Sequence, residues 1–444
     1  MQKISSWLDH QFQLSTQQTS IRREAVAGLT TFVSMAYILF VNPSVLGTAG
    51  MNKGAVFTAT ALASIIGCLL MAFLANYPMA IAPGLADNAF FTYSVVLSLG
   101  IPWQKAMTGV FVASVLFTIL SFMKVREIVI NAIPHDLKLA MASGIGLFIA
   151  FVGLKEGGLV VASKASLVTL GSLAVPTTWL TICGIFVIGI LMARQVPGAI
   201  FYGMLSTMII GLITGLIKLP SRLISVAPSL KPTFAVGIRY LPTMSDPQMW
   251  AVVLIFLLVA FFDTAGTLVG LAQQAGLMKN DQLPRIGQAL MADSLSMLAG
   301  SVLGTTPTSC YVESSAGIAV GGRTGLTSFV VAILFAFSML FSPLLTVVTD
   351  QVTAPALIIV GVLMVSAMKD IHWDRFEVAL PCFLTIIGMP LTYNISYGLA
   401  FGFLTSPLML IAAGKRKEVN GVMWGLFIVF IIMLYILNVL PTAK

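Results

Sequence analysis

Long apolar runs alternate with short polar connections along almost the whole chain. Runs of about 18 to 22 residues recur from residue 25 to residue 440, and each can cross the hydrocarbon core of a bilayer as a helix. The pattern predicts a first set of spans near 25–45, 55–75, 78–98, 104–123, 138–154, 177–193 and 198–217. A second set follows near 248–272, 287–303, 306–321, 325–348, 354–368, 376–393 and 396–413. We therefore expect an all-α polytopic membrane protein with about 14 transmembrane segments.

The two sets of spans divide the chain into halves. An odd number of crossings per half places the second half upside down relative to the first, and inverted repeats are typical of secondary transporters. A further apolar run at 420–440 either adds a crossing or lies against the bundle. The predicted parts are an N-terminal cytoplasmic segment 1–24, a first repeat 25–217, an extracellular or periplasmic connecting loop 218–247, a second repeat 248–413 and a C-terminal segment 414–444 with the further apolar helix.

Composition and charge agree with a membrane solvent. Apolar residues make up 58% of the chain and charged residues 9%, which is too little polar surface for a water-soluble protein of this length. A cytoplasmic N-terminus places 15 of the 24 Lys and Arg residues on inside segments, as the positive-inside rule favours. We therefore assign the net charge of +8 to cytoplasmic loops of a cell (inner or plasma) membrane protein, and not to nucleic-acid binding. The four cysteines stand singly, without metal-ligand spacing, so no metal or cofactor is predicted.

The third span of each half is interrupted at a corresponding place. In the first half the stretch is YPMAIAPGLADNAFFTY, residues 77–93, and in the second it is GTTPTSCYVESSAGIAVGGRTGLT, residues 304–327. Pro83, Gly84 and Pro307 are poor material for a continuous helix. Irregular backbone at membrane depth survives only where it is buried in protein or faces a watery cavity. These matched breaks therefore predict a central binding site.

Asp263, Glu313 and Asp87 are acidic residues within apolar stretches. An ionised carboxylate at the bilayer centre costs about 3 kcal/mol or more unless it is paired or hydrated. Asp263 lies deep in the eighth span, where Thr267 and two glycines form a small polar face. Glu313 lies just beyond the break in the tenth span, near the N-terminus of a half-helix. Two carboxylates at one dry site repel each other, so one of them can hold a proton. Asp87 is a vestibule residue or the partner of a basic group, with direct contact to the substrate as a further alternative.

Other function classes fit less well. An intramembrane enzyme would need a nucleophile-base set or a metal motif, and neither HExxH nor GxSxG occurs, so we expect no enzyme. A channel would need a continuous polar pore in place of isolated acids at broken helices. Arg323, among glycines at the end of the tenth span, is predicted to anchor a turn, with a gating ion pair as the alternative.

Four motifs together carry a family resemblance. IAPGLADNAFFTY, FFDTAGTLVG, YVESSAGIAVGGRTGLT and TAPALIIVGVLM resemble the AzgA-like purine permeases of the nucleobase:cation symporter-2 family, relatives of the bacterial uracil permease. The likeness runs along nearly the whole chain. It implies two inverted repeats of seven, with spans one to four and eight to eleven as a core domain and the others as a gate domain. Relatives also imply a homodimer through gate-domain surfaces.

The resemblance assigns site residues to positions in this chain. Two carboxylates, Asp263 and Glu313, are implied to meet the base and to couple its transport to a proton. The broken spans are implied to supply Asn88, Ala89, Phe90 and Ser309. Apart from the resemblance, the chemistry of a flat ring favours Phe90, Phe91 or Phe262 as the residue that covers its face, and Thr267 beside Asp263 lets substrate or another helix approach.

The chemistry of a purine base suits these groups. Its ring N–H can donate a strong hydrogen bond to a carboxylate, and its flat face can stack on an aromatic ring. We therefore expect a secondary active transporter that imports hypoxanthine and guanine, or adenine, by proton symport with alternating access. An anion or other small-solute exchanger of the same fold and a pyrimidine (uracil) permease are the alternatives. The preferred purine stays open, because adenine presents an amino group where hypoxanthine and guanine present a carbonyl.

Overall fold

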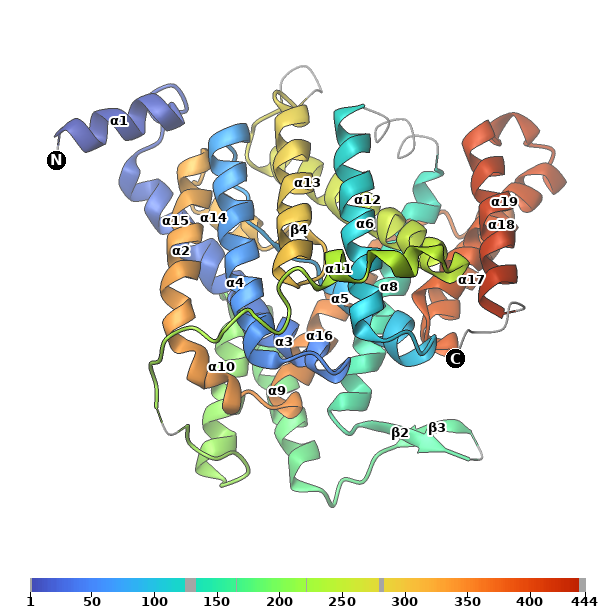
Figure 1. Ribbon diagram of the computed structural model, residues 1–444, viewed down its shortest axis with the longest axis horizontal. Coiled ribbons are helices and arrows are strands. Elements are labelled where there is room, and N and C mark those ends of the chain that lie inside the picture. The colour runs from blue at the N-terminus through green and yellow to red at the C-terminus, as the bar shows by residue number, and fades with distance from the viewer. Residues whose placement is uncertain (1, 124–132, 165, 221, 279–282, 439–444) are drawn as a thin grey trace.

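The computed structural model is a bundle of helices with two small antiparallel strand pairs (Figure 1). It describes residues 2–123, 133–164, 166–220, 222–278 and 283–438; within these ranges the side chains of residues 2–5, 262–266, 269 and 438 lie outside the description. Among the described residues, nine helices are long and apolar enough to cross a membrane, and shorter apolar helices accompany them. Each predicted span falls on one or more of these elements, while the number of crossings stays a prediction.

Among its described residues, the first half of the chain supplies seven helical regions that follow the predicted order of spans. Their elements are α2 (Ile21–Met35) with α3 (Ile38–Thr48), α4 (Lys53–Leu70) with η1 (Met71–Ala75), β1 (Ile81–Pro83) with α5 (Leu85–Ala89) and η2 (Phe90–Ser98), α6 (Trp103–Phe122), α8 (His135–Glu156), α9 (Pro176–Ala193) and α10 (Ala199–Ile213). The third region is the interrupted one, as the prolines and glycines predict.

The second half repeats this order. Its elements are α12 (Pro247–Gln274), α13 (Ile286–Leu303), β4 (Thr308–Cys310) with α14 (Ser314–Ala319), α15 (Gly325–Ser338) with η4 (Met339–Thr346), α16 (Asp350–Val365) with η5 (Ser366–Asp370), α17 (Phe376–Thr392) and α18 (Ile395–Ala412). Again the third region is interrupted by a strand, and a short helix follows it.

Polar residues at the ends of the apolar runs determine where several helices begin. The side chains of Asn52, Asp246 and Asn394 accept hydrogen bonds from the backbone N–H groups of Ala55, Gln248 and Ser396 at 2.9–3.0 Å. Each bond satisfies an N–H group that the first helical turn leaves without a partner. The starts of α4, α12 and α18 are therefore encoded locally.

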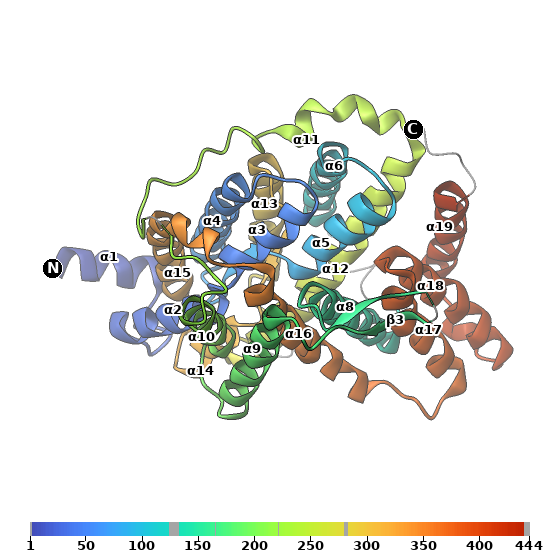
Figure 2. The same ribbon diagram turned by 90° about the horizontal axis from the view of Figure 1, so that it is seen from below.

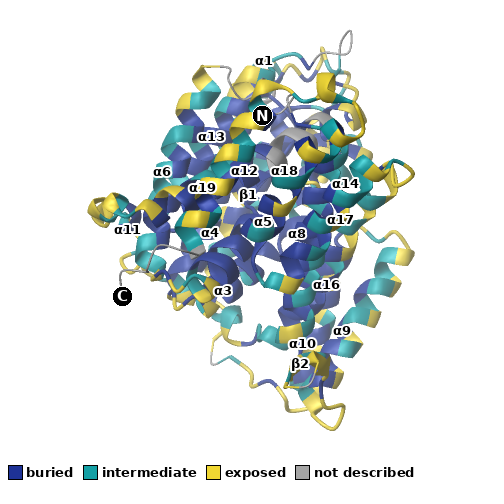
Figure 3. Cartoon of the chain, turned by 90° about the vertical axis from the view of Figure 1, so that its right-hand side faces the viewer, coloured by how far each residue is buried: buried dark blue, intermediate teal, exposed yellow. Residues whose placement is uncertain are grey.

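The helices form two groups that match the expected core and gate domains. In the core domain α13 packs against α4 and α6, α12 packs against α6, and α15 packs against α2 and α4. In the gate domain α8 packs against α16 and α17, α9 packs against α10 and α16, and α17 packs against α18. Seen from below, most of the core helices lie in the upper part of the view and the gate helices in the lower part (Figure 2). Buried residues fill the middle of both groups, and exposed ones lie on their outer surfaces (Figure 3).

Several elements outside the predicted spans complete the fold. The N-terminal segment contains α1 (Gln2–Phe12), and the long connection between the halves contains α11 (Val236–Arg239) and η3 (Leu241–Ser245). A hairpin of β2 (Val160–Ser163) and β3 (Leu167–Leu170) joins α8 to α9 at one end of the bundle, which we call the hairpin end (Figure 1). After η6 (Arg416–Glu418), the last apolar run forms α19 (Gly421–Asn438), which packs against α18 and α12.

Candidate functional site

The two broken segments meet at the centre of the fold. β1 and β4 pair antiparallel, with Ala82 opposite Ser309. The pairing continues on both sides, because Gly84 N–H donates to Pro307 O at 2.8 Å and Tyr311 N–H donates to Ala80 O at 2.9 Å. The helix breaks would leave backbone N–H and C=O groups without hydrogen-bond partners inside a membrane. The two broken segments supply these partners to each other. The crossing lets irregular backbone persist where the predicted site lies.

Glu313 stands at the start of the half-helix that follows the crossing. It is the residue immediately before α14, and its Oε1 accepts a hydrogen bond of 2.5 Å from the Tyr37 hydroxyl. Tyr37 lies at the junction of α2 and α3 and is 1% exposed, whereas Glu313 is half-buried. A bond this short is typical of a hydroxyl donating to a carboxylate. Glu313 is therefore held in one orientation while part of its side chain stays accessible.

Amide and hydroxyl side chains line the other side of the crossing. The Oδ1 atom of Asn88, a buried residue of α5, accepts a hydrogen bond from the Thr306 hydroxyl. Its Nδ2 is buried and has no hydrogen-bond partner among the described residues. Asn42 of α3 donates from Nδ2 to the hydroxyls of Thr60, at 2.7 Å, and Thr305, at 2.9 Å. The buried amide donor of Asn88 can recognise a polar ligand edge, because leaving it unbonded is costly, whereas both donors of Asn42 are already engaged.

The helix that carries Asp263 lies beside both broken segments. α12 packs against α5, β4 and α14. Thr267 is half-buried on this helix. Asp263 and Phe262 belong to its helical backbone, but their side chains lie outside the described residues. The meeting of Asp263 and Glu313 therefore stays a prediction, and what supports it is the position of α12.

The remaining predicted contacts are buried around the crossing. Phe90, the first residue of η2, packs edge-on against Phe256 of α12 with ring centroids 4.7 Å apart, and its side chain is fully buried. Ala89 and Ser309 are also buried. Ser309 belongs to the strand pair, and Ala89 and Phe90 follow β1 in the chain; contact of these three residues with a ligand stays a prediction. Asp87 is fully buried in α5.

The glycine-rich turn after α14 is fixed by side chains from two directions. Arg323 Nη1 donates to the carbonyl oxygens of Ile318, at 2.8 Å, and Gly322, at 2.7 Å. The buried carboxylate of Glu24 accepts the backbone N–H groups of Arg323 and Thr324 and the hydroxyl of Thr327. Arg323 thus lies where a turn anchor is expected, and the turn links α14 to the start of α2.

Sequence reasoning did not single out Tyr37 and Asn42. Tyr37 is 276 positions from the glutamate that it contacts, so no local pattern joins the two. A weak signal was present, because Asn42 and Pro43 interrupt the first apolar run at VNP. α3 continues through Pro43, so the signal here is the polar residue within an apolar span and not a break of the helix.

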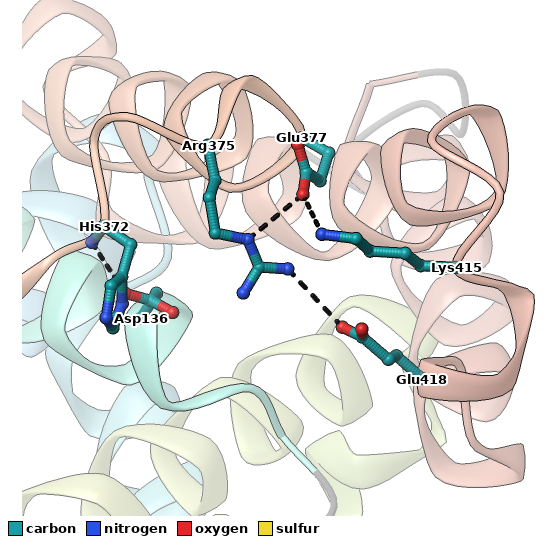
Figure 4. A network of polar contacts seen from close by, with 6 residues as sticks. All are labelled: Asp136, His372, Arg375, Glu377, Lys415 and Glu418. Carbon is teal, nitrogen blue, oxygen red and sulfur yellow. Dashed lines mark hydrogen bonds and ion pairs between the residues drawn. The ribbon is translucent and has the colours of Figure 1, made fainter.

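A second polar cluster lies in the gate domain, away from the crossing (Figure 4). Arg375 lies 3.1 Å from Glu377 and 3.7 Å from Glu418, Lys415 lies 2.5 Å from Glu377, and His372 contacts Asp136 at 2.9 Å. Hydrogen bonding to Glu377 raises the pKa of the Arg375 guanidinium above its ordinary value. A cavity of about 420 Å³ adjoins the cluster and is lined by residues of α8, α17 and α18. Because most of these charges are already paired with one another, we interpret the cluster as a set of ion pairs that holds elements of the gate domain together.

Comparisons with known proteins found a family model and relatives that match nearly the whole chain. A model of the Permease family matches residues 22–401. The guanine/hypoxanthine permease PbuG of Bacillus subtilis is 53% identical over 95% of this chain and 98% of its own length. The adenine permease AdeQ of Escherichia coli is 39% identical over 94% of this chain and 93% of its own.

The fold is similar to that of a solved transporter. The transmembrane domain of the cyanobacterial bicarbonate transporter BicA superposes with a TM-score of 0.62 over 88% of this chain and 97% of that domain, at 16% identity. At this identity the likeness shows the fold alone. It confirms the predicted class, an all-α membrane protein built from inverted repeats.

Proposed function

Because the chain belongs to the Permease family whose model it matches over residues 22–401, we propose that it is a secondary active transporter that imports purine nucleobases by proton symport. It is a multi-pass membrane transporter and not an enzyme. Full-length relatives that share 53% and 39% of its residues are named as guanine/hypoxanthine and adenine permeases. Their names support a purine as the substrate and leave the preferred purine open.

The observation that carries the proposal is Glu313, fixed by Tyr37 beside the strand crossing. A carboxylate held at the start of a half-helix can accept a ring N–H of a neutral base, in a bond roughly twice as strong as one between neutral groups. Asn88 adds an amide donor, and the position of α12, the helix that carries Asp263, beside α5, β4 and α14 supports a place for Asp263 in the same site. Donors and acceptors around a flat ligand favour a base whose edge matches them, since a wrong edge leaves buried groups unbonded.

We assign proton coupling to Asp263 and Glu313. Burying an ionised carboxylate in a dry site costs free energy. A proton that binds together with the substrate removes this charge and so favours closure of the two domains around the loaded site. In the proposed cycle the core domain, which carries the site, moves against the gate domain and exposes the site to one side of the membrane and then to the other. A cytoplasmic N-terminus and a homodimer through gate surfaces belong to the same proposal.

An anion exchanger of the same fold is the main alternative to the purine permease. Such a carrier would place a cation at the substrate position, and neither α12 nor α14 contains a Lys or Arg in its sequence. A uracil permease would share the carboxylates but accept a smaller ring. Both alternatives are outcomes that the following experiment can return.

Uptake of labelled bases tests the proposal directly. Cells without their own purine transport should accumulate hypoxanthine, guanine or adenine when they express the chain, and a protonophore should abolish the accumulation. Uptake of uracil alone, or of none of these bases, would reject the purine proposal.

Two substitutions test the site within the same assay. Asp263→Asn and Glu313→Gln should each lower uptake by at least about tenfold at equal membrane abundance, because each removes a carboxylate worth about 1.5–3 kcal/mol to a bound N–H. Asp374→Asn is the matched control, since Asp374 is an exposed acid in a connection of the gate domain. Normal uptake by either site variant would remove that residue from the mechanism.

A further inference from the structure

Polar contacts join the core domain to the gate domain at the hairpin end. The Ser44 hydroxyl of α3 donates to Asp350 Oδ1 of α16 at 2.9 Å, and Lys53 at the start of α4 lies 3.9 Å from the same carboxylate. The Ile395 backbone N–H at the start of α18 donates to the Ser94 hydroxyl of η2 at 3.1 Å. The two domains are therefore closed against each other at this end of the bundle.

Glu156, the last residue of α8, takes part in this closure. Its Oε1 accepts a hydrogen bond from the hydroxyl of Tyr93 in η2, a residue only 2% exposed. The other oxygen, Oε2, is buried and has no hydrogen-bond partner among the described residues. The neighbouring Lys155 turns away to donate to the Tyr393 hydroxyl at 3.2 Å, with its Nζ 4.6 Å from the centre of that ring. Glu156 thus has one oxygen that is buried without a partner and one that accepts a hydrogen bond from Tyr93.

Aromatic rings cover the contact between Glu156 and Tyr93. The Tyr93 ring lies 5.9 Å from the Tyr393 ring and 6.3 Å from the Phe148 ring, and the last two are 5.6 Å apart. Tyr93 belongs to the core domain, and the other two rings belong to the gate domain. Separating the domains at this end would part these rings and admit water to both oxygens of Glu156.

We propose that Glu156 is a further proton-exchange residue of the carrier, and that a proton taken from the solution at the hairpin end favours closure of the core domain against the gate domain there. The inference rests on the proposed function and adds a residue outside the substrate site. In the step itself, hydronium transfers a proton to Glu156 and becomes water. The Tyr93 hydroxyl then donates to the carbonyl oxygen, and Oε2 carries the proton.

The physical reason is the charge that closure would otherwise bury. An ionised carboxylate taken out of water without a contacting cation is strongly disfavoured, and the neutral acid avoids this cost. The surrounding charges do not supply the missing contact. Asp350 repels the Glu156 carboxylate, while Lys53 and Lys155 attract it but already contact Asp350 and Tyr393, respectively. Tyr93 and Tyr393 face it as neutral hydroxyls.

Cysteine accessibility can test this inference without measuring transport. Ile395 is fully buried beside Ser94, so a cysteine there should react with a membrane-impermeant maleimide only when the hairpin end opens. The background variant is Cys183→Ser, which removes the exposed native thiol. Leu173, 43% exposed in the connection after the hairpin, provides the control position, because the thiolate fraction itself rises with pH. Dividing the Ile395→Cys rate by the Leu173→Cys rate isolates the opening.

The full chain is reconstituted in lipid vesicles and labelled from about pH 5 to about pH 8, the range in which a buried acid can titrate. The normalised rate should rise with pH by up to about tenfold per pH unit, the limit for one proton. With Glu156→Gln, which keeps the shape of the neutral acid, the rate should stay low and independent of pH. The matched substitution Asp350→Asn should keep the pH dependence.

Tyr93→Phe provides a second test, in case the glutamine variant fails to fold. It keeps the titrating group and removes the bond that holds the closed form, so the rate should be higher at every pH and still depend on pH. A flat profile in the parent, a pH dependence retained in Glu156→Gln, or a Tyr93→Phe profile equal to the parent would each overturn the inference. Hypoxanthine uptake by the parent in the same vesicles judges the proposed function separately.

Discussion

The bond between Tyr37 and Glu313 allows a quantitative prediction. Tyr37→Phe removes one hydroxyl and leaves the ring in place, so the Glu313 carboxylate loses the donor that lies 2.5 Å from Oε1. A hydrogen bond to a charged group contributes about 1.5–3 kcal/mol. If Glu313 is ionised when it binds the base, this loss equals a decrease of about 10- to 150-fold in the efficiency of uptake. If it is protonated at that stage, the bond is worth about 1 kcal/mol, and the decrease is about fivefold.

The assay compares initial rates of labelled hypoxanthine uptake below saturation, at matched membrane abundance. Tyr240→Phe is the control, because it deletes the same atom from a ring that is 41% exposed in the connection between the halves. The size of the decrease separates the two cases, because about tenfold or more fits an ionised carboxylate and about fivefold fits a protonated one. If uptake by Tyr37→Phe stays within about twofold of the parent, the loss of free energy is less than about 0.4 kcal/mol. That result would refute the idea that Tyr37 positions the Glu313 carboxylate for the substrate.

Two further predictions concern the support of the site. Gly317→Ala should lower stability by about 1–3 kcal/mol, because the new Cβ would lie 2.1 Å from the Thr31 hydroxyl oxygen, whereas Gly425→Ala, with nothing within 4 Å, should be neutral or slightly stabilising. Thermal unfolding of the purified protein in detergent measures both, and equal midpoints would contradict the packing argument. Glu24→Gln should lower the free energy of unfolding by about 1–3 kcal/mol and reduce uptake. The amide NH₂ of glutamine would face N–H donors such as that of Arg323, whose nitrogen lies 2.9 Å from Glu24 Oε1 in the native protein. An unchanged midpoint for Glu24→Gln would show that this carboxylate does not hold the turn.

The sequence pattern predicts most of the architecture for a simple physical reason. Each span must be apolar over its own length, so the positions of the helices are written locally in the chain. The same logic locates the breaks at Pro83 and Pro307, where a proline that lacks a backbone N–H stands beside other poor helix formers, Gly84 and Thr308. A single proline does not suffice, since α16 continues through Pro355. It also identifies Glu313, because a charge in an apolar stretch requires a reason.

Contacts between distant segments are what the pattern cannot supply. The pairing of Ala82 with Ser309 and the bond from Tyr37 to Glu313 join residues from opposite halves of the chain. Neither is implied by the hydropathy of its own segment. The β2–β3 hairpin was missed for a different reason, since its exposed strands lie in a connection where membrane burial places no constraint on the sequence.

The strand crossing has a consequence for how such carriers diversify. The ladder between residues 81–83 and 308–310 is made of main-chain atoms, so a change of side chain at Ala82 or Ser309 leaves the bonds between the two repeats in place. A lineage can therefore alter the groups around its cargo one residue at a time without dismantling the frame that holds them. Substrate preference can therefore change by single substitutions while the architecture stays constant.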